Sequence, residues 1–286
     1  MTTDFNIDAL VPAEMAQKAE AVGVKKASLA FGPMFVLAVL AGAFISLGAI
    51  FATTVGAGWS ADYPFGLQKL LTGLVFTLGL ILVVVGGAEL FTGNTLIIMA
   101  FMHGRVSIAQ LLRNWGIVYL GNFAGSIATA VIMLLAKQYT FGKGIIGLNA
   151  LNIANSKSGL EFWQALFLGI MCNALVCLAV WLCFSARTTT DKIMAIIPPI
   201  SAFVAAGFEH SIANMYFIPM GMLIKTYGPA SFFENIGKTP ADFANLTWGN
   251  FFINNLIPVT IGNIIGGAVM VGLVYWYIYL RGSKKK

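Results

Sequence analysis

The chain has 286 residues, of which 58% are hydrophobic and only 10% are charged. Soluble domains carry about 25% charged residues, so this composition excludes an ordinary soluble protein and requires lipid around much of the surface. The formal net charge of +6 fits basic loops and a basic tail that face anionic lipid headgroups, and it implies no nucleic-acid partner.

The N-terminal segment, residues 1–28, lacks the apolar stretch of a signal peptide, so we expect the first membrane segment to stay in the mature protein. Residues 9–23 pattern as an amphipathic helix, with Pro12 near its first turn and Met15 and Val22 on its apolar side. We expect residues 1–28 to form a cytoplasmic amphipathic helix along the membrane surface.

Six apolar stretches are long enough to cross a membrane, which takes about 20 residues. They cover residues 30–53, 67–102, 112–136, 162–184, 193–224 and 251–280. The second and the fifth are too long and too interrupted to be single clean spans. We therefore predict an all-α membrane protein with a six-helix channel domain at 29–280 and a basic cytoplasmic tail at 281–286.

The basic residues indicate the orientation of these spans. Six spans place both termini on one side, and that side would hold 11 of the 17 basic residues, mostly in short loops and tails. These are Lys18, Lys25, Lys26, Arg105, Arg113, Arg187, Lys192, Arg281, Lys284, Lys285 and Lys286. Because cytoplasmic loops are enriched in Lys and Arg, we predict that both termini are cytoplasmic in a bacterial inner membrane.

Two motifs recur in the two halves of the chain. GAELFTGN at 87–94 matches GFEHSIAN at 207–214 in Gly, Glu and Asn, with an offset of 120 residues. GNFAG at 121–125 matches GNIIG at 262–266, with an offset of 141 residues. Each half would hold three spans, an odd number, so the second copy enters the membrane from the opposite side. The sequence thus predicts two inverted repeats, at about 29–136 and 161–280, with the solute path at their interface.

Polar residues at mid-membrane depth identify the predicted centre of this path. Glu89, Glu209 and His210 fall deep inside the second and fifth apolar stretches, and charged groups there must face protein or water. Glycines beside them favour a break in each helix, so helices 2 and 5 are predicted to be broken. The half-helix N-termini at a break attract anions, and Thr92 and His210 add a hydroxyl and a titratable donor.

The neighbours of the two breaks have more ordinary interpretations as well. We interpret Glu89, Glu209 and Asn94 as groups that hold the breaks together by bonding freed backbone, while His210 is interpreted as functional and Asn214 as reaching the path. The Gly-x-x-x-Gly pairs indicate close helix packing. His103, in a predicted cytoplasmic loop, is expected to be solvated. The apolar residues Phe76, Leu80, Leu90 and Phe203 pack the core by default, but together they are also candidates for hydrophobic constrictions above and below the polar centre.

Three runs resemble the formate/nitrite transporter family, and within it the formate channels. They are ELFT at 89–92, GFEHSIANM at 207–215 and NLIPVTIGN at 255–263, and the likeness extends over nearly the whole chain. The resemblance implies an aquaporin-like six-helix protomer in a homopentamer, with one pore in each protomer. One departure is visible, since Glu89 stands where formate channels usually have an aspartate.

The resemblance also implies roles for individual residues. Thr92 and His210 would flank the central site, and Phe76, Leu80, Leu90 and Phe203 would form the constrictions. Asn173 and Asn214 would line the path, Lys157 would gather anions on the periplasmic side, and the N-terminal helix would act at the cytoplasmic mouth.

The expected function is transport of formate or a similar small monovalent anion, without a cofactor. In this hypothesis His210 either donates a hydrogen bond or gives up a proton, so that the solute crosses the second apolar ring as the neutral acid. Nitrite or hydrosulfide transport by the same architecture remains an alternative, as does passive flow rather than proton coupling. A neutral-solute channel is less consistent with His210 and the exposed amides. A membrane-embedded enzyme would need an acid–base pair with a nucleophile or a metal cluster, and a purely structural or receptor protein would leave two polar breaks unexplained.

Overall fold

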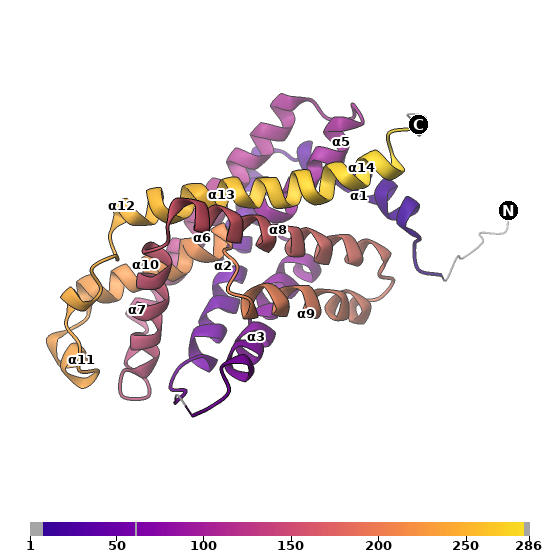
Figure 1. Ribbon diagram of the computed structural model, residues 1–286. Helices are drawn as coiled ribbons and strands as arrows, with labels where there is room; N and C mark the ends of the chain where they lie inside the picture. Colours follow the sequence, from indigo (N-terminus) through magenta and orange to yellow (C-terminus); the bar gives the residue numbers. More distant parts are fainter. Residues whose placement is uncertain (1–7, 61, 283–286) are drawn as a thin grey trace.

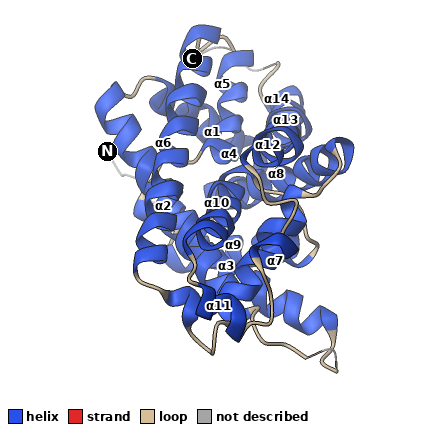
Figure 2. Ribbon diagram, turned by 90° about the vertical axis from the view of Figure 1, so that its left-hand side faces the viewer, coloured by secondary structure: helices blue, strands red, loops and turns tan. Residues whose placement is uncertain are grey.

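The computed structural model describes residues 8–60 and 62–282, and every regular element in this part of the chain is helical (Figure 2). The first seven residues of the predicted N-terminal segment, and residues 283–286 of the predicted basic tail, lie outside the described residues. Long helices run side by side in a bundle, and α1 and α14 lie together at one end of it (Figure 1). The described ends of the chain therefore share one side of the molecule.

The first half of the chain forms elements whose lengths follow its apolar stretches. They are α1 (Pro12–Ala27), α2 (Phe31–Val55), α3 (Phe65–Gly86), α4 (Phe91–Asn94), the 3₁₀ turn η1 (Thr95–Ile97), α5 (Ile98–Met102) and α6 (Ile108–Leu135). The second predicted stretch is thus divided, because the helix that begins at Phe65 stops at Gly86 and a new one begins at Phe91.

The second half contains a comparable series. A 3₁₀ turn, η2 (Gln138–Thr140), is followed by α7 (Ile145–Ser158), α8 (Phe162–Ser185), α9 (Thr189–Ala205), α10 (Ser211–Tyr227), α11 (Ala230–Asn235) and the 3₁₀ turn η3 (Pro240–Asp242). One continuous helical stretch closes the chain through α12 (Trp248–Asn250), π-helical η4 (Phe251–Leu256), α13 (Ile257–Ile264), π-helical η5 (Ile265–Leu273) and α14 (Val274–Tyr279).

Five helices in the described chain are long and apolar enough to cross a membrane. They are Phe31–Val55, Phe65–Gly86, Ile108–Leu135, Phe162–Ser185 and Trp248–Tyr279. The remaining predicted stretch, 193–224, is divided between α9 and α10, each of 17 residues. A helix of that length lies at the lower limit for crossing the hydrocarbon layer, so neither meets the length criterion alone.

Small residues let the long helices approach closely. Gly121 and Gly125 on α6 lie against the backbone of α2, where a Cβ on Gly125 would overlap the Val39 carbonyl. In the same way, a Cβ on Gly266 would overlap the Ile170 carbonyl of α8. These contacts agree with the packing role predicted for the Gly-x-x-x-Gly pairs.

The N-terminal helix α1 packs on the protein through its smallest side chains. Ala16, Ala19 and Ala27 are buried, and α1 contacts α5, η1, α8 and α14. This packing also buries His103, whose Nδ1 lies 2.9 Å from Glu20 Oε2. The expectation that His103 is solvated was wrong, because α1 covers the loop that carries it.

Candidate functional site

Helices α3 and α9 end in the same way. Gly87 and Gly207 have φ values of +83° and +73°, a left-handed conformation that glycine adopts at little cost. The next amide in each case bonds back to the last turn, Ala88 N–H to Val83 O at 2.9 Å and Phe208 N–H to Phe203 O at 3.0 Å. This closing pattern stops a helix cleanly, so each interruption is built by local sequence.

Asparagine side chains satisfy the backbone of both interruptions. Asn122 Nδ2 donates to Glu89 O at 2.9 Å, and its Oδ1 accepts from Phe91 N–H at 2.9 Å. Asn263 makes the matching pair of bonds to Glu209 O and Ser211 N–H, at 3.0 and 2.9 Å. Unpaired backbone groups inside a membrane cost several kcal/mol each, so these side chains stabilise non-helical backbone at that depth.

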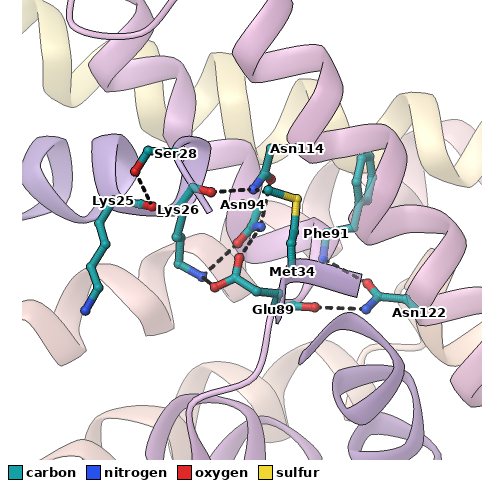
Figure 3. Close-up of polar contacts among 9 residues, drawn as sticks. All are labelled: Lys25, Lys26, Ser28, Met34, Glu89, Phe91, Asn94, Asn114 and Asn122. Atoms are coloured by element: carbon teal, nitrogen blue, oxygen red, sulfur yellow. Dashed lines mark hydrogen bonds and ion pairs between the residues drawn. The ribbon is translucent and has the colours of Figure 1, made fainter. Parts of the chain in front are cut away.

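A buried polar group surrounds the first interruption (Figure 3). Lys26 Nζ lies 2.8 Å from Glu89 Oε1 and 3.0 Å from Asn94 Oδ1. Asn94 Nδ2 in turn donates to Glu89 Oε2 at 2.7 Å and to Asn114 Oδ1 at 2.9 Å. Asn114 Nδ2 donates back to Lys26 O at 3.0 Å, which closes the ring of contacts.

The second interruption has an equivalent group. Lys157 Nζ lies 2.7 Å from Glu209 Oε1, and Asn214 Nδ2 donates to Glu209 Oε2 and Asn255 Oδ1, both at 2.7 Å. Asn255 Nδ2 donates to Lys157 O at 3.0 Å. The asparagines keep the offsets of 120 and 141 residues found in the sequence, and the lysines differ by 157 − 26 = 131. Unlike Asn94, Asn214 leaves its Oδ1 without a hydrogen-bond partner among the described residues.

Thr92 and His210 meet between the two interruptions. Thr92 Oγ1 lies 3.0 Å from His210 Nε2, and both residues are buried. The other ring nitrogen, Nδ1, accepts a hydrogen bond from Ala213 N–H at 3.1 Å and so caps the start of α10. A nitrogen that accepts cannot carry the proton, so Nε2 holds it and donates to the Thr92 hydroxyl.

Two cavities approach this pair from opposite ends of α3 and α9. The α7 cavity, of about 390 Å³, is lined in part by Lys69, Phe76, Lys157, Phe203, Glu209, His210 and Asn214. The α1 cavity, of about 440 Å³, is lined in part by Lys18, Lys25, Lys26, Leu80, Glu89, Leu90, Asn94 and Lys192. Thr92 lines neither cavity, so it lies in the closed region between them.

The four predicted constriction residues are divided between these cavities. The Phe76 and Phe203 rings meet edge to face, with centroids 5.7 Å apart, and Phe203 also lies over the His210 ring at 5.9 Å. Leu80, one turn further along α3, faces the α1 cavity together with Leu90. Apolar side chains thus separate the polar pair from each cavity. Asn173, predicted to line the path, is fully buried and faces neither cavity.

Sequence reasoning missed the residues of α1 that take part in the site. Lys26 was read only as part of the positive side of the membrane, yet it pairs with Glu89. Burial and the nearby charges of Lys192 and Arg187 lower the pKa of Lys18, whose Nζ donates to Phe184 O at 2.9 Å. The mouth of the α1 cavity is therefore strongly positive. The matched spacing of Lys26 and Lys157 would have been a usable signal.

A helical bundle with spans long enough to cross a membrane, and with cavities converging on a buried polar pair, is typical of membrane channels and transporters. The chain matches the formate/nitrite transporter family over residues 13–277. It is 47% identical over 281 residues to the formate channel FocA of Escherichia coli (strain K12), covering 98% of both chains. It is 43% identical to the formate channel FocA of Haemophilus influenzae, covering 94% of this chain and 95% of that one.

Solved structures give the same result. A structure described as a pentameric formate channel with formate bound matches with a TM-score of 0.82 at 51% identity, covering 87% of this chain and 97% of the other. A second, described as an FNT family ion channel, matches with a TM-score of 0.79 at 29% identity, covering 93% and 98%. The chain therefore belongs to the formate/nitrite transporter family, and it is a membrane transport protein rather than an enzyme.

Proposed function

We propose that the chain carries formate, or a similar small monovalent anion, through a pore inside each protomer. The observation that carries this proposal is the buried Thr92–His210 pair between two cavities that both contain lysines. It is supported by the formate channels among the relatives. By the same likeness, the protomers assemble as a homopentamer in the bacterial inner membrane, surrounded by lipid and with both termini in the cytoplasm.

The pore is formed by two inverted repeats of three spans each. The first consists of α2, α3 with α4 to α5, and α6, and the second of α8, α9 with α10, and the helix that contains α13. Equal contacts on the two interruptions support this architecture, because Glu89 N–H bonds to Leu37 O at 3.2 Å and Glu209 N–H to Leu168 O at 3.3 Å. Inverted repeats place a solute site at the interface of the two halves, where Thr92 and His210 meet.

An anion that enters the α1 cavity is drawn by its lysines and then meets Leu80 and Leu90. Passing an apolar ring removes its water. At the centre, Thr92 and His210 replace that water with hydrogen bonds, and Phe76 and Phe203 form the second ring towards the α7 cavity. Because a bare anion is costly in an apolar ring, the solute crosses this ring as the neutral acid.

Capping of α10 supports a donor role for His210 in this step. With Nδ1 accepting from Ala213 N–H, the imidazole presents one N–H, on Nε2, towards Thr92. That arrangement leaves the Thr92 hydroxyl hydrogen free to donate to an oxygen of the anion. The proton that neutralises the solute then comes from water in either cavity, and net transport follows the gradients of formate and protons.

Formate and nitrite flux into liposomes at pH 7 and pH 5 tests the proposal. We expect preferred formate flux that changes with pH in the wild type, and a His210→Ala variant that loses this pH dependence. Preferred nitrite or hydrosulfide flux would keep the site and change the substrate. Absence of anion flux at both pH values would contradict a transport role for the polar pair.

A further inference from the structure

The Thr92 carbonyl, on the other side of the residue from the hydroxyl that meets His210, is the focus of a separate polar cluster. Thr95 Oγ1 donates to Thr92 O at 2.7 Å, Asn173 Nδ2 at 3.2 Å and Cys177 Sγ at 3.4 Å. Three side chains from two elements, η1 and α8, thus converge on one backbone oxygen. Asn173 and Cys177 are one helical turn apart on α8, so both face the first interruption.

The cluster is isolated from the solute path. Thr92, Thr95, Asn173 and Cys177 are all fully buried, and none of them lines the α1 or the α7 cavity. The members also bond one another, since Asn173 Nδ2 and Cys177 Sγ lie 3.2 and 3.3 Å from Thr95 Oγ1. These side chains therefore have no direct access to a solute in this structure, and any effect on transport must pass through Thr92.

The C-terminal span closes the cluster from behind. A Cβ on Gly267 would overlap Thr95 Oγ1 and Asn173 Nδ2 and lie 2.7 Å from Cys177 Sγ. Gly267 belongs to η5, and π-helical segments often occur at functional sites. Asn173 Nδ2 also donates to Asn263 O at 2.6 Å, so the cluster joins the Thr92 backbone to the span that holds the second interruption.

The cluster is not imposed by the internal repeat. With the offset of 131 residues that relates Lys26 to Lys157, Asn173 corresponds to Gly42, which packs directly on the Asn122 carbonyl. With the offset of 120, Thr95 corresponds to Met215. The hydrogen-bonding side chains thus occur only at the interruption that carries Thr92. A purely structural need of the fold would be expected in both halves.

We propose that Thr95, assisted by Cys177 and Asn173, is a positioning residue that holds the Thr92 backbone so that its hydroxyl faces His210 Nε2. Thr95 makes the shortest of the three bonds to the carbonyl, and its hydroxyl also accepts from Asn173. Loss of this hydroxyl lets the first turn of α4 rotate and misdirects the Thr92 hydroxyl. The inference rests on the proposed transport function and adds to it a group that sets the geometry of the site.

The test measures formate flux into liposomes for Thr95→Val, which keeps the shape of the side chain and removes its hydroxyl. We expect flux about three- to tenfold below wild type, the range for loss of one neutral hydrogen bond, and recovery in Thr95→Ser. Thr129→Val is the matched control, because Thr129 Oγ1 bonds to Gly125 O at 2.8 Å within α6, away from the site. Its flux is expected to equal that of the wild type.

A double-mutant cycle with Thr92→Val separates positioning from general destabilisation. If Thr95 acts through the Thr92 hydroxyl, Thr95→Val adds no further loss of flux in the Thr92→Val background. Unchanged flux in Thr95→Val, or an equal fold-loss in both backgrounds, would overturn the inference. Should Thr95→Val fail to fold, Cys177→Ala gives the same cycle with a weaker donor removed. A wild type without formate flux would instead contradict the proposed function itself.

Discussion

Lys26 Nζ lies 2.8 Å from Glu89 Oε1, which ties a helix outside the predicted spans to the interruption between α3 and α4. Only about a quarter of the lysine side chain is exposed, 27%, and 7% of the glutamate side chain. A charge pair in such surroundings is costly to break from one side, because the remaining ion keeps its burial and loses its partner. The position of α1 and the shape of the interruption are therefore coupled.

Removal of Lys26 should destabilise the protein. In Lys26→Met the Glu89 carboxylate keeps Asn94 as its side-chain donor among the described residues, and we expect a loss of about 1–3 kcal/mol, the range for a buried polar group left unpaired. The thermal unfolding midpoint in detergent measures this. Lys25→Met is the matched control, since Lys25 is exposed and its side chain makes no hydrogen bond in the described chain. Equal midpoints for the two variants would contradict the coupling.

Neutralising Lys192 should slow anion uptake from the α1 cavity. Its charge adds to those of Lys18 and Lys25 around the same mouth, and one charge at about 10 Å in water changes the local anion concentration by about twofold. We expect Lys192→Gln to lower formate flux from this side at low salt and to match wild type at 1 M salt, where the screening length is about 3 Å.

Lys238→Gln serves as the control for this experiment, because Lys238 is exposed in the loop between α11 and η3 and lines neither cavity. Flux through that variant from the α1 side should not change. A deficit in Lys192→Gln that persists at high salt would indicate a structural effect rather than an electrostatic one.

Local patterns predicted much of this fold. Apolar stretches located the spans, and the recurrence of Gly, Glu and Asn located both interruptions, because a glycine that ends a helix and an asparagine that bonds freed backbone act near their own position in sequence. Thr92 and His210 were found for the same reason, since each opens a short helix after an interruption.

Contacts between distant segments were not predictable in this way. Lys26 and Glu89 are 63 residues apart, and a single lysine near a span end has an ordinary explanation in membrane orientation. Thr95 and Cys177 carry no pattern at all, as a threonine and a cysteine in apolar helices are usually fillers. His103 was misjudged because its burial depends on the packing of α1, which amphipathic periodicity alone does not define.

The tautomer of His210 is a direct prediction from the capping geometry. At pH 7 the proton should reside on Nε2, with Nδ1 accepting from Ala213 N–H. Nitrogen-15 NMR of the histidine-labelled protein in lipid distinguishes a protonated from an unprotonated ring nitrogen. A His103→Asn variant leaves His210 as the only histidine and assigns the signal. A proton on Nδ1 would contradict both the cap and the donor role proposed for Nε2.

Close packing of the spans makes a final prediction that is independent of transport. In Gly125→Ala the new methyl group would overlap the Val39 carbonyl, a backbone atom that cannot rotate away, so α2 and α6 must separate. We expect a loss of stability of about 1–3 kcal/mol or more, as for other overpacked cores. Gly116→Ala, on the same helix, is the control, because a Cβ there meets no atom within 4 Å. Alanine is the better helix former, so this control should unfold at or above the wild-type midpoint, and a fall as large as that of Gly125→Ala would show that helix contact is not the cause.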